Sequence, residues 1–217
     1  MKEIEDHQFG TSTLDSSKVT CAKPRGTAQK SVSVLMLNLI ALIVAFITYG
    51  IFVIAALRCF SANRPVAKRN KLFVTLMGSI TIVAILACIF KSGSEGSPQK
   101  IAGIIFILLG LGLFLASLAA NRWRRMEYAG TDTPPLLLIT VGPYAYLRHP
   151  IYASYSLGWL GGALCSMDPI AMVPSAAMAV FYVFAARNEE MAIMQSELFA
   201  AYRDYKTRVS MFIPYVI

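Results

Sequence analysis

The sequence predicts an all-α, polytopic membrane protein with about five transmembrane helices and a C-terminal amphipathic helix. Of its 217 residues, 56% are hydrophobic and only 15% are charged, whereas soluble domains carry about 25% charged residues. The apolar residues also come in long blocks, and the mean hydropathy is +0.58. Such blocks avoid the cost of exposed apolar surface only in lipid, where helices satisfy their own backbone polar groups. A soluble globule, a disordered chain and a disulfide-stapled secreted module are therefore excluded.

The chain divides into three regions. Residues 1–30 are polar and aperiodic, which predicts a flexible tail; residues 31–120 form the first transmembrane helices, and residues 121–217 hold the remaining elements. At about 1.5 Å per residue, the longer apolar segments span a hydrocarbon core of roughly 30 Å. Asp168 and Pro169 separate the last two segments, which predicts a tight helical hairpin. The predicted segments are residues 32–57, 72–90, 101–120, 150–167 and 170–186.

The distribution of basic residues predicts the orientation in the membrane. Loop 58–71 carries several lysines and arginines and no acid, loop 121–149 is rich in arginine, and loop 91–100 is poor in basic residues. Positive charge marks cytoplasmic loops. The first and third loops and the C-terminus are therefore predicted to be cytoplasmic, with the N-terminus outside. The net charge of +8 is thus interpreted as an orientation signal, and no nucleic-acid partner is expected.

Cysteines and small residues carry less chemical information. The four cysteines include no Cys-x-x-Cys pair, so no metal site and no redox dithiol is predicted. Ser154, Gly158 and Gly162 recur every four residues and share one helix face, where another helix backbone can approach closely. Gly103 and Gly110 are predicted to pack in the same way.

The end of loop 121–149 is the first candidate site. It reads Gly142-Pro143-Tyr144, followed by Arg148-His149-Pro150 and Tyr152. Pro150 suits the first position of a helix. The free N–H groups after it, with Arg148 and His149 as further donors, would form an anion site. The alternative is that Arg148 anchors the helix at the lipid headgroups and the tyrosines form an interfacial belt.

The second candidate site follows the last apolar segment. An apolar stripe at helical spacing runs through Met191, Met194, Leu198, Tyr202, Tyr205 and Val209. Continued backward, this stripe reaches Glu190 and Arg187, which predicts that both face the protein and that Glu189 is turned away. Carboxylates buried at a membrane boundary require a positive partner. The alternative is that the two glutamates cap a helix or pair with Arg187.

These motifs together resemble the isoprenylcysteine carboxyl methyltransferase family and the related phospholipid methyltransferases. The resemblance covers about residues 121–214 and includes the pair Tyr202 and Tyr205 and the terminal Ile213-Pro214. It implies an integral membrane enzyme that uses S-adenosylmethionine at a cytoplasmic site and methylates a membrane lipid or a lipidated acceptor. No metal is implied. The Gly-x-Gly-x-x-Gly pattern of soluble dinucleotide-binding domains is absent from the sequence.

The resemblance also implies roles for individual residues. Three charged side chains are expected at the reaction centre: Arg148, Arg187 and Glu190. The acceptor is expected to contact Arg187, Tyr202 and Tyr205. The residues expected to enclose the cofactor are Gly142, Pro143, Tyr144, His149, Pro150, Tyr152, Glu189 and Glu190.

Four functions are compatible with these residues. Methylation of a prenylcysteine carboxylate competes with N-methylation of a phospholipid amine. The spacing from the two glutamates to the tyrosine pair is one residue longer than in the prenylcysteine enzymes, and Leu198 and Phe199 stand where the family has Phe-Gly. Since one residue turns a helix face by about 100°, the acceptor side is expected to differ while the cofactor side persists. Membrane sterol-type reductases, which use NADPH, share a similar His-Pro-x-Tyr segment but have Asn where this chain has Ile151. A non-catalytic membrane scaffold is the fourth alternative.

Overall fold

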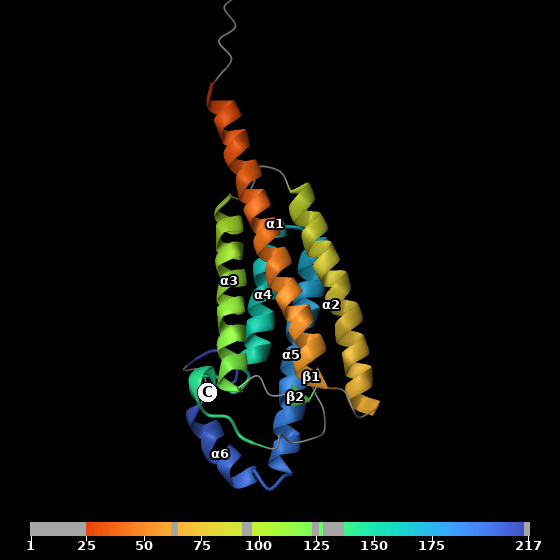
Figure 1. Ribbon diagram of the computed structural model, residues 1–217, viewed down its shortest axis with the longest axis vertical. Helices are drawn as coiled ribbons and strands as arrows, with labels where there is room; N and C mark the ends of the chain where they lie inside the picture. The colour runs from red at the N-terminus through yellow and green to blue at the C-terminus, as the bar shows by residue number, and fades with distance from the viewer. Residues whose placement is uncertain (1–24, 62–64, 93–96, 123–125, 128–136, 215–217) are drawn as a thin grey trace, which may run out of the picture.

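A computed structural model describes residues 25–61, 65–92, 97–122, 126–127 and 137–214, and it confirms the all-α fold (Figure 1). Five helices lie side by side as a bundle, and the sixth lies across one end of it. Two strands of two residues each pair in parallel. The elements are α1 Arg25–Cys59, β1 Phe60–Ser61, α2 Pro65–Lys91, α3 Ser97–Ala120, β2 Met126–Glu127, the 3-10 helix η1 Gly142–Ala145, α4 Pro150–Ser166, α5 Pro169–Met194 and α6 Phe199–Arg208.

Among the described residues, four helices, α1, α2, α3 and α5, are long and apolar enough to cross a membrane. The fourth predicted segment forms α4, whose 17 residues reach about 25 Å, at the lower limit for a membrane-spanning helix. Most residues of α4 are buried, and its most extensive packing is against α3. Most apolar residues of α4 therefore contact protein rather than lipid, Leu160 being exposed, and α4 is the central helix of the bundle.

Three helices extend beyond the apolar segments predicted for them. Helix α1 begins at Arg25, inside the predicted tail, whose residues 1–24 lie outside the described part of the chain. Helix α2 begins at Pro65, and helix α5 continues to Met194. In each case the helix extends past the apolar segment into polar residues, because the backbone hydrogen bonds of a helix do not end where its contact with lipid ends.

Close backbone packing joins α3 to α4, as the small residues predict. A Cβ atom on Gly103 would lie 2.6 Å from the Gly161 carbonyl oxygen, and one on Gly110 would lie 2.8 Å from the Ser154 carbonyl oxygen. Gly158 and Gly162 instead face aromatic side chains of α1, where a Cβ atom would contact Phe52 and Tyr49, respectively. The glycines of α4 therefore let helices approach it on two sides.

A polar contact fixes the end of the bundle that lies away from α6. Lys100 in α3 is buried, and its Nζ donates to Asn38 Oδ1 in α1 at 2.7 Å. Asn38 Nδ2 in turn donates to the Ser92 carbonyl, just after α2, at 2.7 Å. Hydrogen bonds between helices contribute to association in lipid, where the hydrophobic effect supplies little. These two bonds join the first three helices.

The opposite end of the bundle gathers the segments that carry the predicted motifs. Figure 1 shows the end of α1, the start of α2, the end of α3, the start of α4 and the end of α5 there, together with α6. The basic residues after α1 thus lie at the same end as the candidate sites. That this end faces the cytoplasm stays a prediction.

The packing of α3 against α4 predicts a specific sensitivity. Gly161→Ala places a Cβ atom 2.6 Å from the Gly103 carbonyl oxygen and 2.8 Å from the Ile107 amide nitrogen. Since backbone cannot move aside cheaply, we expect a loss of about 1–3 kcal/mol in unfolding free energy. Gly112→Ala on α3, where a Cβ atom meets nothing within 4 Å, is the control and gains up to about 1 kcal/mol from helix propensity. Thermal unfolding in detergent measures both; equal stability of the two variants would contradict the close approach.

Candidate functional site

The loop before α4 is shaped by a glycine and anchored by a tyrosine. Gly142 has φ of 61°, a conformation that costs other residues energy, and it starts η1 with Pro143 directly after it. Tyr205 of α6 donates its hydroxyl to the Tyr144 carbonyl at 2.5 Å. Burial raises the pKa of Tyr205 to about 12, so its hydroxyl stays protonated and remains a donor. The loop and α6 are therefore held together.

The side chain of Arg148 makes polar contacts with both α5 and α6. Its side chain is buried, and Nε donates to Glu190 Oε1 at 2.8 Å. Nη1 donates to the carbonyls of Lys206 and Val209 at the C-terminal end of α6. A cation at the end of a helix compensates the partial negative charge of the free carbonyls. Arg148 therefore fixes α6 against α5 instead of pointing into an open anion site.

The carboxylate of Glu190 is buried and uses both of its oxygens. Oε1 contacts Arg148 and also His149 Nε2, the latter at 3.3 Å, and Oε2 accepts from Lys206 Nζ at 2.7 Å. A buried carboxylate is stable only with such compensation. Burial and the nearby Glu190 charge raise the pKa of Tyr202. Glu190 thus joins α5, α6 and the start of α4.

Glu189 faces the same place, so its predicted orientation away from the site is wrong. Its side chain is 25% exposed, and its Oε2 lies 3.7 Å from His149 Nδ1. Its Oε1 accepts a hydrogen bond from the Tyr152 hydroxyl. His149 lies between the two glutamates and stacks on Tyr152, with ring centroids 5.7 Å apart. Burial, with a contribution from the Glu189 charge, raises the pKa of Tyr144.

The predicted orientation of Arg187 is also wrong, because its side chain is exposed. Met191 and Met194 of the predicted stripe are exposed as well, and Ile193 is buried in their place. The reason is a break in the helix: Ser196 Oγ donates to the Ile193 carbonyl at 2.7 Å and accepts from the Leu198 amide at 3.2 Å. The stripe is correct only after this break, where the apolar cluster contains Leu198, Tyr202, Tyr205 and Val209.

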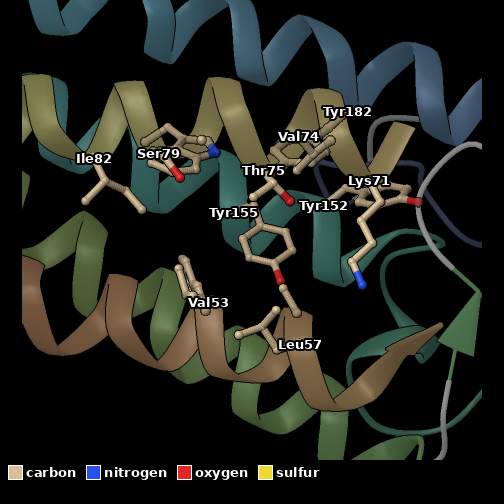
Figure 2. A pocket seen from close by; sticks show the side chains of 14 residues that line it. Val53, Leu57, Lys71, Val74, Thr75, Ser79, Ile82, Tyr152, Tyr155 and Tyr182 are labelled. Atoms are coloured by element: carbon tan, nitrogen blue, oxygen red, sulfur yellow. The ribbon is translucent and has the colours of Figure 1, made fainter. Parts of the chain in front are cut away.

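An apolar pocket lies between α1, α2, α4 and α5, with a volume of about 120 Å³. Figure 2 shows Val53 and Leu57 on one wall and Val74, Ser79 and Ile82 on the opposite wall. Three tyrosines also line it, and Tyr182 stacks on both of the others with ring centroids 5.5 Å apart. The lining residues are Phe52, Val53, Ala56, Leu57, Lys71, Val74, Thr75, Gly78, Ser79, Ile82, Tyr152, Tyr155, Trp159 and Tyr182.

Tyr152 connects the pocket to the polar residues. Its ring lines the pocket, whereas its hydroxyl donates to Glu189. Of the pocket residues, only Tyr152 was singled out by the sequence. The wall from α1 and α2 was missed, since its residues have no motif and resemble those that face lipid. Within the described ranges, no three His, Cys, Asp or Glu side chains gather as a metal site would require.

Comparison with known proteins shows a similarity to membrane methyltransferases over part of the chain. The phospholipid methyltransferase family profile matches residues 98–200. The chain is 31% identical over 121 residues to the protein-S-isoprenylcysteine O-methyltransferase of Rattus norvegicus. The aligned region covers 53% of this chain and 41% of that protein. Its identity to the Homo sapiens protein of the same name is 30% over 123 residues, which covers 54% of this chain and 42% of that protein.

A nickel-cobalt-cadmium resistance protein, NccN, of Alcaligenes xylosoxydans xylosoxydans is also similar, with 24% identity over 136 residues that cover 62% of each chain. The chain spans less than two thirds of the length of each of these relatives. The matched region contains α3 from its second residue onward, the motif before α4, and α5 with the two glutamates. Residues 98–200 of the chain are thus similar to the phospholipid methyltransferase family, and the four long apolar helices among the described residues are those of an integral membrane protein.

Proposed function

We propose that this protein is a methyltransferase that uses S-adenosylmethionine and methylates a lipid or a lipid-modified acceptor. One observation carries the proposal: at Tyr152 a partly exposed carboxylate adjoins an apolar pocket within the membrane-spanning helices. A water-soluble cofactor needs the first environment, and the apolar chain of an acceptor needs the second. The family relation supports the same assignment.

The chemistry of the polar residues fits the cofactor. S-adenosylmethionine would supply a methyl group that the positive charge of its sulfonium already activates. Glu189, which is 25% exposed, offers negative charge to the sulfonium or to the ammonium of the cofactor. The rings of His149 and Tyr152 offer flat surfaces for an adenine, and the Gly142-Pro143-Tyr144 segment borders the same region. Pro150 places Tyr152 within the first turn of α4.

Glu190 and Arg148 act in this proposal as positioning residues. Both oxygens of Glu190 are engaged by Arg148, His149 and Lys206, and its side chain is 7% exposed. Tyr205 holds the loop by its hydroxyl, and Tyr202 packs beside it. These contacts leave Glu189 as the more accessible carboxylate. They orient His149 and Glu189 without requiring contact with the reacting atoms.

The apolar pocket suits the chain of the acceptor. It extends along α2 from Lys71 to Ile82, a distance of about 16 Å along the helix axis. That is roughly half the thickness of the hydrocarbon core. The pocket would hold one chain from a single leaflet, align the acceptor group with the methyl donor and exclude water. An arginine such as Arg187 would orient an acceptor carboxylate only if the acceptor reaches the exposed face of α5.

Cofactor binding gives the first test of this proposal. We expect S-adenosylmethionine to raise the unfolding temperature of the purified protein in detergent, because a ligand of the folded state alone stabilises it by mass action. NADPH, the cofactor of the sterol-type reductase alternative, is the control and should give no shift. A shift with NADPH and none with S-adenosylmethionine would refute the proposed function.

The two glutamates should respond differently to substitution. Glu189→Gln removes charge from a partly exposed position, so we expect S-adenosylmethionine affinity to fall roughly ten- to a hundredfold, as for loss of about 1.5–3 kcal/mol. The free energy of unfolding should change little.

Glu190→Gln should instead destabilise the fold by about 3 kcal/mol, because the buried Arg148 guanidinium loses its counter-charge. Glu197→Gln, at an exposed position in the turn before α6, is the matched control for both variants. Titration calorimetry and denaturant unfolding separate the two effects. If Glu189→Gln binds the cofactor as the parent does, Glu189 has been given the wrong role.

A further inference from the structure

Of the described residues that line the apolar pocket, Lys71 is the one that carries a charge. It lies in α2 and is half-buried. Figure 2 shows its side chain reaching from α2 toward α1, on the side where Leu57 lies. The other lining residues are apolar, aromatic or hydroxyl-bearing. A single positive charge therefore enters a pocket that is otherwise suited to a hydrocarbon chain.

The charge lies at one end of the pocket. Lys71 is within two turns of the start of α2, and Tyr152 is within the first turn of α4, and both of these helices start at the same end of the bundle (Figure 1). Ser79 and Ile82 lie farther along α2, toward the other end of the bundle. The ammonium group is therefore on the side of Glu189 and His149. The apolar part of the pocket extends away from them.

The neighbouring basic residues behave differently. Lys68 and Arg69, on the same helix, are exposed, as expected of cations at a membrane boundary that extend toward water. Lys71 instead lines the pocket, and among the residues that the structure describes no carboxylate forms an ion pair with it. A cation partly removed from water favours a negative partner. A bound ligand can supply that partner.

We propose that Lys71 binds an anionic group of the acceptor, either a carboxylate or a phosphodiester, carried at the end of an apolar chain. This inference rests on the proposed function, since it names the class of acceptor for the same site. The ammonium holds the anion next to Tyr152, and the chain fills the pocket toward Ile82. Lys71 precedes the region that the family profile matches, residues 98–200. The residue that selects the acceptor in this proposal therefore lies in α2, outside the matched region.

The test uses the full chain in a neutral detergent without phospholipid. The sequence has two tryptophans, so Trp123→Phe leaves Trp159, a lining residue, as the only indole that reports pocket occupancy. Three ligands with the same dodecyl-length chain are titrated: N-dodecanoylglycine, dodecyl methyl phosphate and monododecanoylglycerol. They carry a carboxylate, a phosphodiester and a neutral head, respectively. The comparison of the two anions distinguishes a carboxylate acceptor from a phospholipid.

We expect at least one anion to bind about tenfold more tightly than the neutral ligand, and Lys71→Met to abolish that preference. Lys71→Arg should retain it, and Lys68→Met, the matched control on the same helix, should leave it unchanged. Lys71→Gln replaces Lys71→Met if that variant does not fold. Equal affinity for all three ligands, a preference that survives Lys71→Met, or an equal loss in Lys68→Met would overturn the inference.

The same variants separate this inference from the proposed function. The unfolding-temperature shift caused by S-adenosylmethionine should be the same for Lys71→Met and the parent, because Lys71 lies in the pocket wall and not among the polar residues around Glu189. If the anions are preferred but S-adenosylmethionine causes no shift in unfolding temperature, the proposed function is refuted and only an anion-selective lipid pocket remains. A shift without the preference would remove only the role of Lys71.

Discussion

The buried carboxylate of Glu190 is the contact on which the candidate site depends. It belongs to α5, and it binds Arg148 and His149 from the start of α4 and Lys206 from α6. Helices in lipid gain little from the hydrophobic effect when they associate, so polar contacts and close packing must fix their positions. At this end of the bundle, one carboxylate fixes three segments. The buried charge stays compensated only while all three remain together.

As a consequence, Tyr152 lies at a boundary between a polar, water-accessible region and an apolar pocket among the membrane-spanning helices. Arg148 binds the end of α6 and Tyr205 binds the loop before α4, so α6 lies across the polar residues. On the other side of Tyr152, the aromatic side chains lead into the pocket between α1, α2, α4 and α5. A reaction between a water-soluble donor and a membrane-embedded acceptor needs such a boundary, because neither solvent dissolves both reactants.

The sequence could predict the helices and the polar motif but not their full geometry. Long apolar blocks located the spans, and prolines such as Pro150 marked helix starts. The orientation of Arg187 could not be obtained by extending a helical period backward, because the helix breaks at Ser196, where a side chain competes for backbone hydrogen bonds. The same break invalidated the predicted orientation of Glu189.

The pocket could not be predicted from the sequence, for a different reason. Apolar residues of a membrane helix have the same composition whether they face lipid or a cavity, so Val53 or Val74 gave no signal. Lys71 did give a signal, but a basic residue next to a span is first interpreted as a topology marker. Only the packing of α1 and α2 around Tyr152 distinguishes a pocket residue from an interfacial one.

The most direct test of the central claim is a methyl-transfer assay with radiolabelled S-adenosylmethionine. The purified chain is placed in vesicles that are either made from a total lipid extract or supplied with a prenylcysteine analogue, and the label that reaches the lipid phase is measured. The account predicts label in an extractable lipid or in the analogue, with a rate that collapses in Tyr152→Ala, where the polar residues and the pocket lose the side chain that they share. Label that stays wholly in S-adenosylmethionine with both acceptor sources, or transfer that is unchanged in Tyr152→Ala, would contradict it.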